Sequence, residues 1–87
     1  MKIIWDEPKR LANLEKHKLD FADLNERFFE EAFVLRAHGY KRYRAIGMNI
    51  RGVICVVFAS YGNEAVSIIS MRPARKDERK AYEENRR

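Results

Sequence analysis

Hydrophobic residues follow two different spacings along this chain, and the spacing changes near residue 32. Leu11 and Leu14, and then Phe21, Leu24 and Phe28, recur at three- and four-residue intervals, which is the period of a helix. After residue 32 the apolar positions fall in short runs separated by turns that contain glycine or asparagine, which is typical of strands. We therefore predict two helices first and a meander of strands after them.

Capping residues and turns give the boundaries of these elements. A short strand is expected at residues 2–5, followed by a helix that Asp6 caps and that ends near His17. Asp20, helped by Asp23, is predicted to cap the second helix. The expected strands of the meander are residues 32–37, 42–48, 53–60 and 65–71.

The last segment is charged and has little apolar surface, and we predict a C-terminal helix there. Arg75, Glu78, Arg79 and Tyr82 fall at i, i+3, i+4 and i+7, so a helix would place them on one face. The alternative is a solvated helix held by ion pairs. Helices at one end of the sequence and a meander at the other predict an α+β fold of order β-α-α-β-β-β-β-α.

Composition sets the size of the core. A chain of 87 residues with 46% hydrophobic positions predicts one domain, residues 1–87, with a thin core. The strand at residues 53–59 is apolar on both faces, and the C-terminal helix offers little apolar cover for one of them. We therefore expect a partner chain on that side.

Basic charge is concentrated in the middle of the chain. The formal net charge is +5, and residues 32–63 hold five basic residues and no acidic one. Tyr40, Tyr43 and His38 lie among these basic residues. Basic side chains could neutralise phosphates and the rings could stack on unpaired bases, although a solvated sheet face would show the same composition.

The single cysteine and the N-terminus limit the function classes. Cys55 lies in an apolar strand, so we expect a buried, inert thiol and no intrachain disulfide. The only apolar stretch near the start is residues 3–5, which is too short for a signal peptide or a membrane span. The expected location is the cytoplasm, with no membrane partner.

Two motifs give the chain a family resemblance. The opening motif is Trp5-Asp6-x-x-Lys9-x-x-x-Asn13-x-x-Lys16-His17 followed by Phe21, and the closing motif is Ile69-Ser70-Met71-Arg72-Pro73-Ala74 with Glu78-Arg79-x-x-Tyr82. Together they resemble the signatures of BrnT toxins of bacterial type II toxin–antitoxin pairs, over almost the whole chain. Met71 and Pro73 depart from the expected pattern, and Pro73 biases Arg72 toward extended geometry.

The resemblance implies a fold and a biology. A RelE-like fold is expected, with RNA cleavage that inhibits translation and arrests growth. The implied partner is a small ribbon-helix-helix-like antitoxin of the BrnA type, and the complex would bind operator DNA through that antitoxin. A homodimer or a heterotetramer would fit the expected need for a partner chain.

RNA cleavage without a metal needs a base, an acid and cations for the phosphorane. The candidate catalytic residues are His17, Arg44, Arg72, Arg75, Glu78, Arg79 and Tyr82. The candidate RNA-binding residues are Lys9, Lys16, Arg36 and Arg42. Because the histidines are far apart and no cysteine pair or carboxylate cluster accompanies them, we expect no metal and no cofactor.

Two other functions remain open from the sequence. The basic window would equally suit a nucleic-acid-binding module without catalysis, or a protein whose charge serves only to dock an acidic or amphipathic antitoxin. His17 could simply bond the last carbonyls of its helix, and Lys9 and Lys16 could lie on the outer side of that helix.

Overall fold

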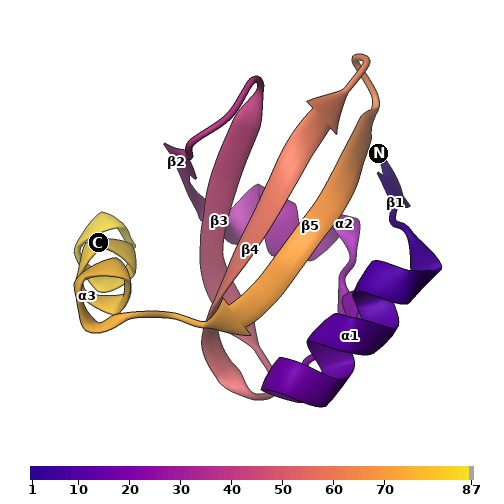
Figure 1. Ribbon diagram of the computed structural model, residues 1–87. Coiled ribbons are helices and arrows are strands. Elements are labelled where there is room, and N and C mark those ends of the chain that lie inside the picture. The colour runs from indigo at the N-terminus through magenta and orange to yellow at the C-terminus, as the bar shows by residue number, and fades with distance from the viewer. Residues whose placement is uncertain (87) are drawn as a thin grey trace.

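The computed structural model describes residues 1–86 and shows an α+β domain (Figure 1). Its elements follow in the order β1 (Lys2–Ile4), α1 (Glu7–His17), the 3₁₀ turn η1 (Phe21–Asp23), α2 (Glu26–Glu31), β2 (Phe33–Arg36), β3 (Arg42–Asn49), β4 (Gly52–Tyr61), β5 (Ala65–Pro73) and α3 (Lys76–Asn85). The predicted α+β class and the four strands of the meander are confirmed, with boundaries within about two residues.

The sheet is mixed. Its strand order is β1-β5-β4-β3-β2, and β2 to β5 form the expected antiparallel meander. The short N-terminal strand β1 adds a fifth strand that runs parallel to β5, with Ile3 opposite Val66. The connection from β1 to β5 spans most of the chain, so no local sequence signal fixes this pairing.

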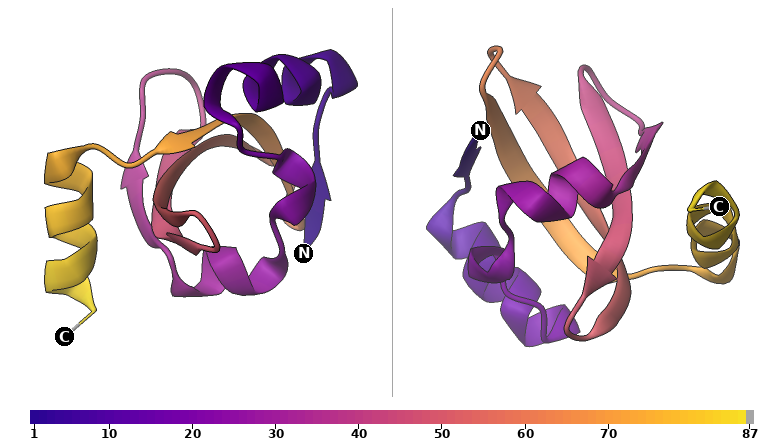
Figure 2. Two further views of the ribbon diagram at one scale, coloured as in Figure 1. Left: turned by 90° about the horizontal axis from the view of Figure 1, so that it is seen from below. Right: turned by 180° about the vertical axis from the view of Figure 1, so that it is seen from behind.

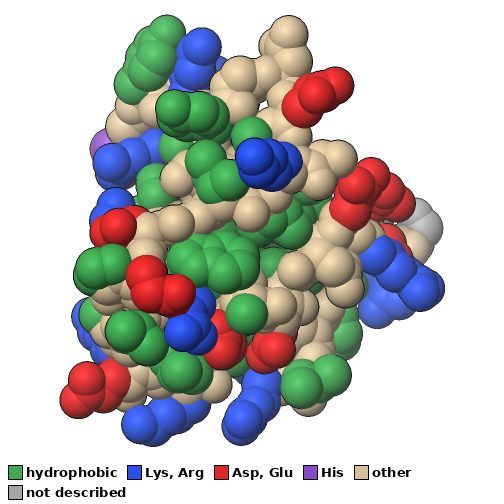
Figure 3. Space-filling model, turned by 90° about the vertical axis from the view of Figure 1, so that its right-hand side faces the viewer, with side chains coloured by type: hydrophobic (Ala, Val, Ile, Leu, Met, Phe, Trp, Pro, Cys, Tyr) green, Lys and Arg blue, Asp and Glu red, His purple; other side chains and the backbone are tan. Residues whose placement is uncertain are grey.

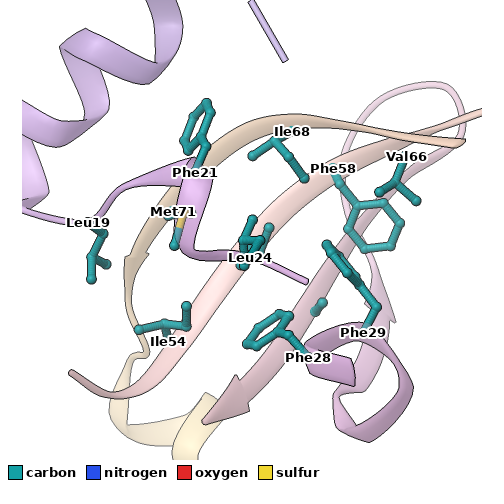
Figure 4. Packing of buried hydrophobic residues seen from close by; sticks show 12 residues of the cluster. Leu19, Phe21, Leu24, Phe28, Phe29, Ile54, Phe58, Val66, Ile68 and Met71 are labelled. Atoms are coloured by element: carbon teal, nitrogen blue, oxygen red, sulfur yellow. The ribbon is translucent and has the colours of Figure 1, made fainter. Parts of the chain in front are cut away.

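One face of the sheet carries the main core. The segments α1, η1 and α2 pack against this face, which we call the covered face (Figure 2). Phe21, Ile68 and Met71 are buried in the centre of the core (Figure 4). Gly47 is needed where α2 crosses β3, because a Cβ there would lie 2.8 Å from the ring of Phe28.

The predicted second helix is wrong in its start. Asp20 accepts a hydrogen bond from the Ala22 N–H and caps only the short turn η1, and Leu24 then returns to extended geometry. Asn25 caps the helix itself by accepting from the Phe28 N–H. The buried positions were nevertheless right, because a turn followed by a short helix buries Phe21 and Phe28 as well as one longer helix would.

The opposite face is only partly covered. Helix α3 lies against its β2–β3 side, where Tyr82 packs with Ile46 and Cys55 (Figure 1). The rest of this face, over β3, β4 and β5, carries no other element of the described chain, and we call it the open face (Figures 1 and 2). Thin cover by α3 was predicted. None of the helices within residues 1–86 is long and apolar enough to cross a membrane.

Candidate active site

Two arginines project from the open face because of strand alternation. Arg44 on β3 is opposite Val57 of β4, and Arg72 on β5 is opposite Cys55 of the same strand. Val57 and Cys55 are two residues apart, so their side chains and those of both arginines share one face. Strand β4 thus separates the two arginines in the sheet, while their guanidinium groups meet above it.

The two guanidinium groups meet at Glu78, in the first turn of α3. Arg72 donates to Oε1 at 2.7 Å through Nη1 and to Oε2 at 2.9 Å through Nη2, which is a bidentate pair. Arg44 donates to Oε2 at 2.8 Å through Nη1. The backbone N–H of Arg75 donates to Oε1 at 2.9 Å and so fixes the start of α3. These contacts form what we call the arginine–glutamate cluster: Arg44, Arg72 and Glu78.

Glu78 is ionised and fully hydrogen-bonded. Its side chain is 1% exposed, and hydrogen bonds from Arg72, the Arg75 N–H and Arg44 lower its pKa from 4.5 to about 2 against the opposing effect of burial. A carboxylate offers about four acceptor positions, and the four hydrogen bonds fill them. Glu78 therefore has neither the basicity nor a free lone pair to take a proton from a substrate.

Cys55 lies beneath this cluster. Its thiol is fully buried, as predicted, and burial raises its pKa to about 11. The thiol therefore stays protonated at neutral pH and is a poor nucleophile.

The remaining candidates on and next to α3 divide into exposed and buried groups. Arg75 and Arg79 are exposed, and Arg75 occupies the N-cap position in extended geometry rather than a position inside the helix. Tyr82 is 5% exposed and anchors α3 to the sheet. It also lines a pocket of about 490 Å³ on the α2 side, which the arginine–glutamate cluster does not reach. Glu78 and Tyr82 thus share the buried face of α3, whereas Arg75 and Arg79 are exposed.

The candidates on α1 lie away from the cluster. Lys9, Lys16 and His17 belong to α1, which packs on the covered face, whereas α3 lies on the opposite face (Figure 2). The structure therefore does not bring His17 together with Glu78 and the arginines, although all were candidate catalytic residues.

The two candidate arginines of the basic window separate in the same way. Arg36 is opposite Tyr43 in the β2–β3 ladder, and its guanidinium carbon lies 5.9 Å from the centre of that ring, on the covered side. Arg42 is opposite Ala59 and shares the open face with Arg44. Only Arg42 of this pair is therefore placed beside the candidate site.

Asn13 has a role that the sequence did not reveal. Its spacing from Lys9 and Lys16 would put it with them on one face of α1, but Asn13 is only 7% exposed. Its side chain donates to the Leu19 carbonyl at 3.1 Å and accepts from the Met71 N–H at 3.0 Å. Asn13 therefore ties α1 to β5 at the residue before Arg72. A polar residue at a buried helical position was the signal available, since such groups are normally hydrogen-bonded.

The part of the chain that the structure describes holds no ligand set for a metal ion. Within residues 1–86, no three His, Cys, Asp or Glu side chains lie together in a way that could hold an ion. The charged centre of the open face is instead built from guanidinium groups around one carboxylate, an arrangement suited to binding a phosphate.

Comparison with known proteins identifies the family and supports the fold. The chain is a small α+β domain with a cationic cluster on an open sheet face, and residues 5–78 match the family described as "Ribonuclease toxin, BrnT, of type II toxin-antitoxin system". The chain belongs to this BrnT family, as the two motifs indicated. The matched region contains the arginine–glutamate cluster and stops before Arg79 and Tyr82.

A solved structure agrees. The chain resembles the 1.1 Å crystal structure of the Brucella abortus ribonuclease toxin BrnT with a TM-score of 0.79 and 51% identity. The alignment covers 87% of this chain and 99% of the Brucella chain. No curated protein sequence matches this chain. Membership of a type II toxin family implies an antitoxin partner.

Proposed function

We propose that this protein is a metal-independent endoribonuclease that cleaves RNA in the cytoplasm and thereby inhibits translation and growth. The observation that carries this proposal is the arginine–glutamate cluster, in which a buried carboxylate holds two guanidinium groups on an uncovered sheet face. Family membership supports the ribonuclease activity. Beyond family membership, we propose that RNA is cleaved at this cluster and that its arginines act on the scissile phosphate.

In this proposal Arg44 is the residue that contacts the scissile phosphate. A guanidinium has five N–H donors, and among the described residues Arg44 uses only Nη1, for Glu78. Its other donors are free to bind the phosphate oxygens as negative charge develops on the phosphorane. Both terminal nitrogens of Arg72 donate hydrogen bonds to Glu78, so Arg72 contributes positive charge and holds the carboxylate in place.

Glu78 acts as a positioning residue rather than as an acid or base. It fixes the orientation of both guanidinium groups before substrate arrives, which removes the cost of ordering them during the reaction. Arg75 and Arg79, exposed at the start of α3, are the further cations that a bound RNA strand would meet. Arg42 extends the positive charge along β3.

The biological partner in this proposal is a ribbon-helix-helix-like antitoxin of the BrnA type. The uncovered sheet face leaves room for an antitoxin segment that covers the cluster and so blocks RNA. The resulting complex, a heterotetramer or a pair built on a toxin homodimer, would repress its operon through the antitoxin. The toxin alone carries no groove-reading motif, so its own DNA binding would be weak and strongly salt-dependent.

The test compares two arginines on opposite faces of the sheet. Arg44→Lys keeps a positive charge but loses the planar fork, so cleavage of single-stranded RNA by the purified toxin should slow by roughly a hundredfold or more. Arg36→Lys is the matched control, because Arg36 lies on the covered side. This variant should cleave RNA like the parent. Both proteins should melt like the parent.

Growth gives the second measurement. Inducing the parent gene without antitoxin should arrest a bacterial host, Arg44→Lys should not, and a co-expressed antitoxin should restore growth. RNA binding without any cleavage by the parent would instead favour a non-catalytic nucleic-acid-binding module. Equal cleavage by parent and Arg44→Lys would remove the cluster from the active site.

A further inference from the structure

The hairpin turns at one end of the sheet carry exposed aromatic side chains. Tyr40, in the β2–β3 turn, is 85% exposed, and Tyr61, the last residue of β4, is 66% exposed. Both turns lie at the upper end of the sheet in Figure 1. The backbone N–H of Ser60 donates to the Lys41 carbonyl at 3.0 Å, which places Tyr40 and Tyr61 on neighbouring chain segments.

This end of the sheet is continuous with the candidate active site. Val57, Ala59 and Tyr61 are spaced two residues apart along β4 and therefore point to the same face. Tyr61 thus shares the open face with Arg44 and Arg42, which lie opposite Val57 and Ala59. Arg72 is level with Cys55, six residues from Tyr61 along β4, a distance of about 20 Å at ~3.3 Å per residue. A line of cations thus runs up the open face toward the Tyr61 ring, and Tyr40 lies in the neighbouring turn.

The local charge favours a polyanion. Lys41 and Arg42 lie beside Tyr40, and the Lys41 ammonium is 5.3 Å from the centre of the Tyr40 ring. No acidic residue occurs between residues 32 and 63, and Glu64 in the β4–β5 turn is the single carboxylate nearby in sequence. At this upper end, Figure 3 shows hydrophobic and basic side chains together on one side and an acidic side chain on the other.

Of the tyrosines in this region, Tyr40 and Tyr61 are free to stack on a base and Tyr43 is not. Tyr43, which belongs to the same basic window, is half-buried and stacks on Phe58 on the covered face, with ring centres 5.6 Å apart and planes at 29°. Tyr40 and Tyr61 have no such aromatic partner among residues 1–86. Large rings left in water beside cations are the arrangement that binds unpaired bases.

We propose that Tyr40 and Tyr61 form a base-stacking subsite for single-stranded RNA, about 20 Å up the open face from Arg72. Lys41 and Arg42 would neutralise the phosphates between this subsite and the arginine–glutamate cluster. The subsite holds bases that flank the scissile bond and so sets the preference for unpaired RNA. This inference rests on the proposed function, because it adds a binding subsite to the same enzyme.

The experiment measures binding without cleavage. The probe is a fluorescent single-stranded 2′-O-methyl RNA, which lacks the attacking hydroxyl, and Kd is measured by anisotropy at fixed salt. Tyr40→Ala and Tyr61→Ala should each weaken binding by about five- to 150-fold. Tyr40→Phe and Tyr61→Phe keep the ring and should bind like the parent. Both sites are exposed, so all four variants should melt like the parent.

An abasic probe of the same length and charge separates stacking from electrostatics. The parent and the Ala variants should bind it equally, because no base is present to stack. Ala variants that bind the RNA probe like the parent would overturn the subsite, even if the parent cleaves RNA. If the antitoxin instead no longer neutralises the Ala variants in a growth assay, Tyr40 and Tyr61 belong to a protein interface. A parent that neither binds nor cleaves RNA would overturn the proposed function as well.

Discussion

Replacing Glu78 by glutamine tests the central carboxylate of the site. The change keeps the shape but removes the charge, and the amide NH₂ would face guanidinium donors that now lack an acceptor. A pKa lowered from 4.5 to about 2 corresponds to ~3 kcal/mol of stabilisation of the folded protein at neutral pH. We therefore expect Glu78→Gln to lower the free energy of unfolding by about 3 kcal/mol at pH 7.

The pH dependence gives a sharper form of this prediction. Because folding depresses the Glu78 pKa, its contribution is complete above about pH 5 and is lost as the pH falls toward 2. The gap in unfolding free energy between parent and Glu78→Gln should therefore shrink from about 3 kcal/mol at pH 7 to less than half of that at pH 3. Urea titrations of both proteins at pH 7, 5, 4 and 3 measure it.

Taking the difference between the two proteins removes the other acidic groups from the comparison. Asp20 and Glu26 also have lowered pKa values, through hydrogen bonds from the Ala22 N–H and the N-terminal amine respectively, but they titrate in both proteins. A gap that stays constant from pH 7 to pH 3 would show that Glu78 is not held ionised by Arg72 and Arg44. The reasoning about its charge would then be refuted.

Three further predictions concern the neighbourhood of the cluster. Arg75→Ala, at an exposed N-cap, should leave the melting temperature and antitoxin binding unchanged but abolish growth arrest; a fully toxic variant would remove Arg75 from the site. Asn13→Ala strands the buried Met71 N–H and Leu19 carbonyl and should cost about 2–4 kcal/mol in urea unfolding, whereas a cost below about 0.5 kcal/mol would contradict the tie to β5. RNA cleavage should survive excess EDTA, and loss that a divalent ion restores would reveal a metal site.

Much of the fold was predictable because its signals are local. The turns predicted around the glycines at 39, 52 and 62 separate the strands, and each of these glycines adopts a positive φ. The pairing of β1 with β5 was not predictable, because it joins segments about sixty residues apart in sequence. The second helix starts late because Leu24 is extended and Asn25, not Asp20, caps α2.

For the site, the sequence identified residue types better than roles. Arg44, Arg72 and Glu78 were all candidates, and the structure brings these three together. The spacing of Glu78 and Tyr82 on one helical face could not show that both are buried, because a helix with little apolar surface is expected to be solvated. Nor could it show which strand face each arginine occupies until the register was known.

Burial of Glu78 links the stability of the domain to the geometry of its site. Helix α3 brings little apolar surface to the sheet apart from Tyr82, so the ion pairs with Arg72 and Arg44 supply a large part of its attachment. The same ion pairs orient the guanidinium groups that are proposed to meet the phosphate. Replacing Glu78 alone by an apolar residue would leave two partly buried guanidinium groups without their partner and so destabilise the domain, even though exchanging a whole buried ion-pair cluster for apolar residues is often tolerated. In the proposed mechanism the carboxylate of Glu78 therefore has two effects, because it holds α3 to the sheet and gives both arginines a common anchor.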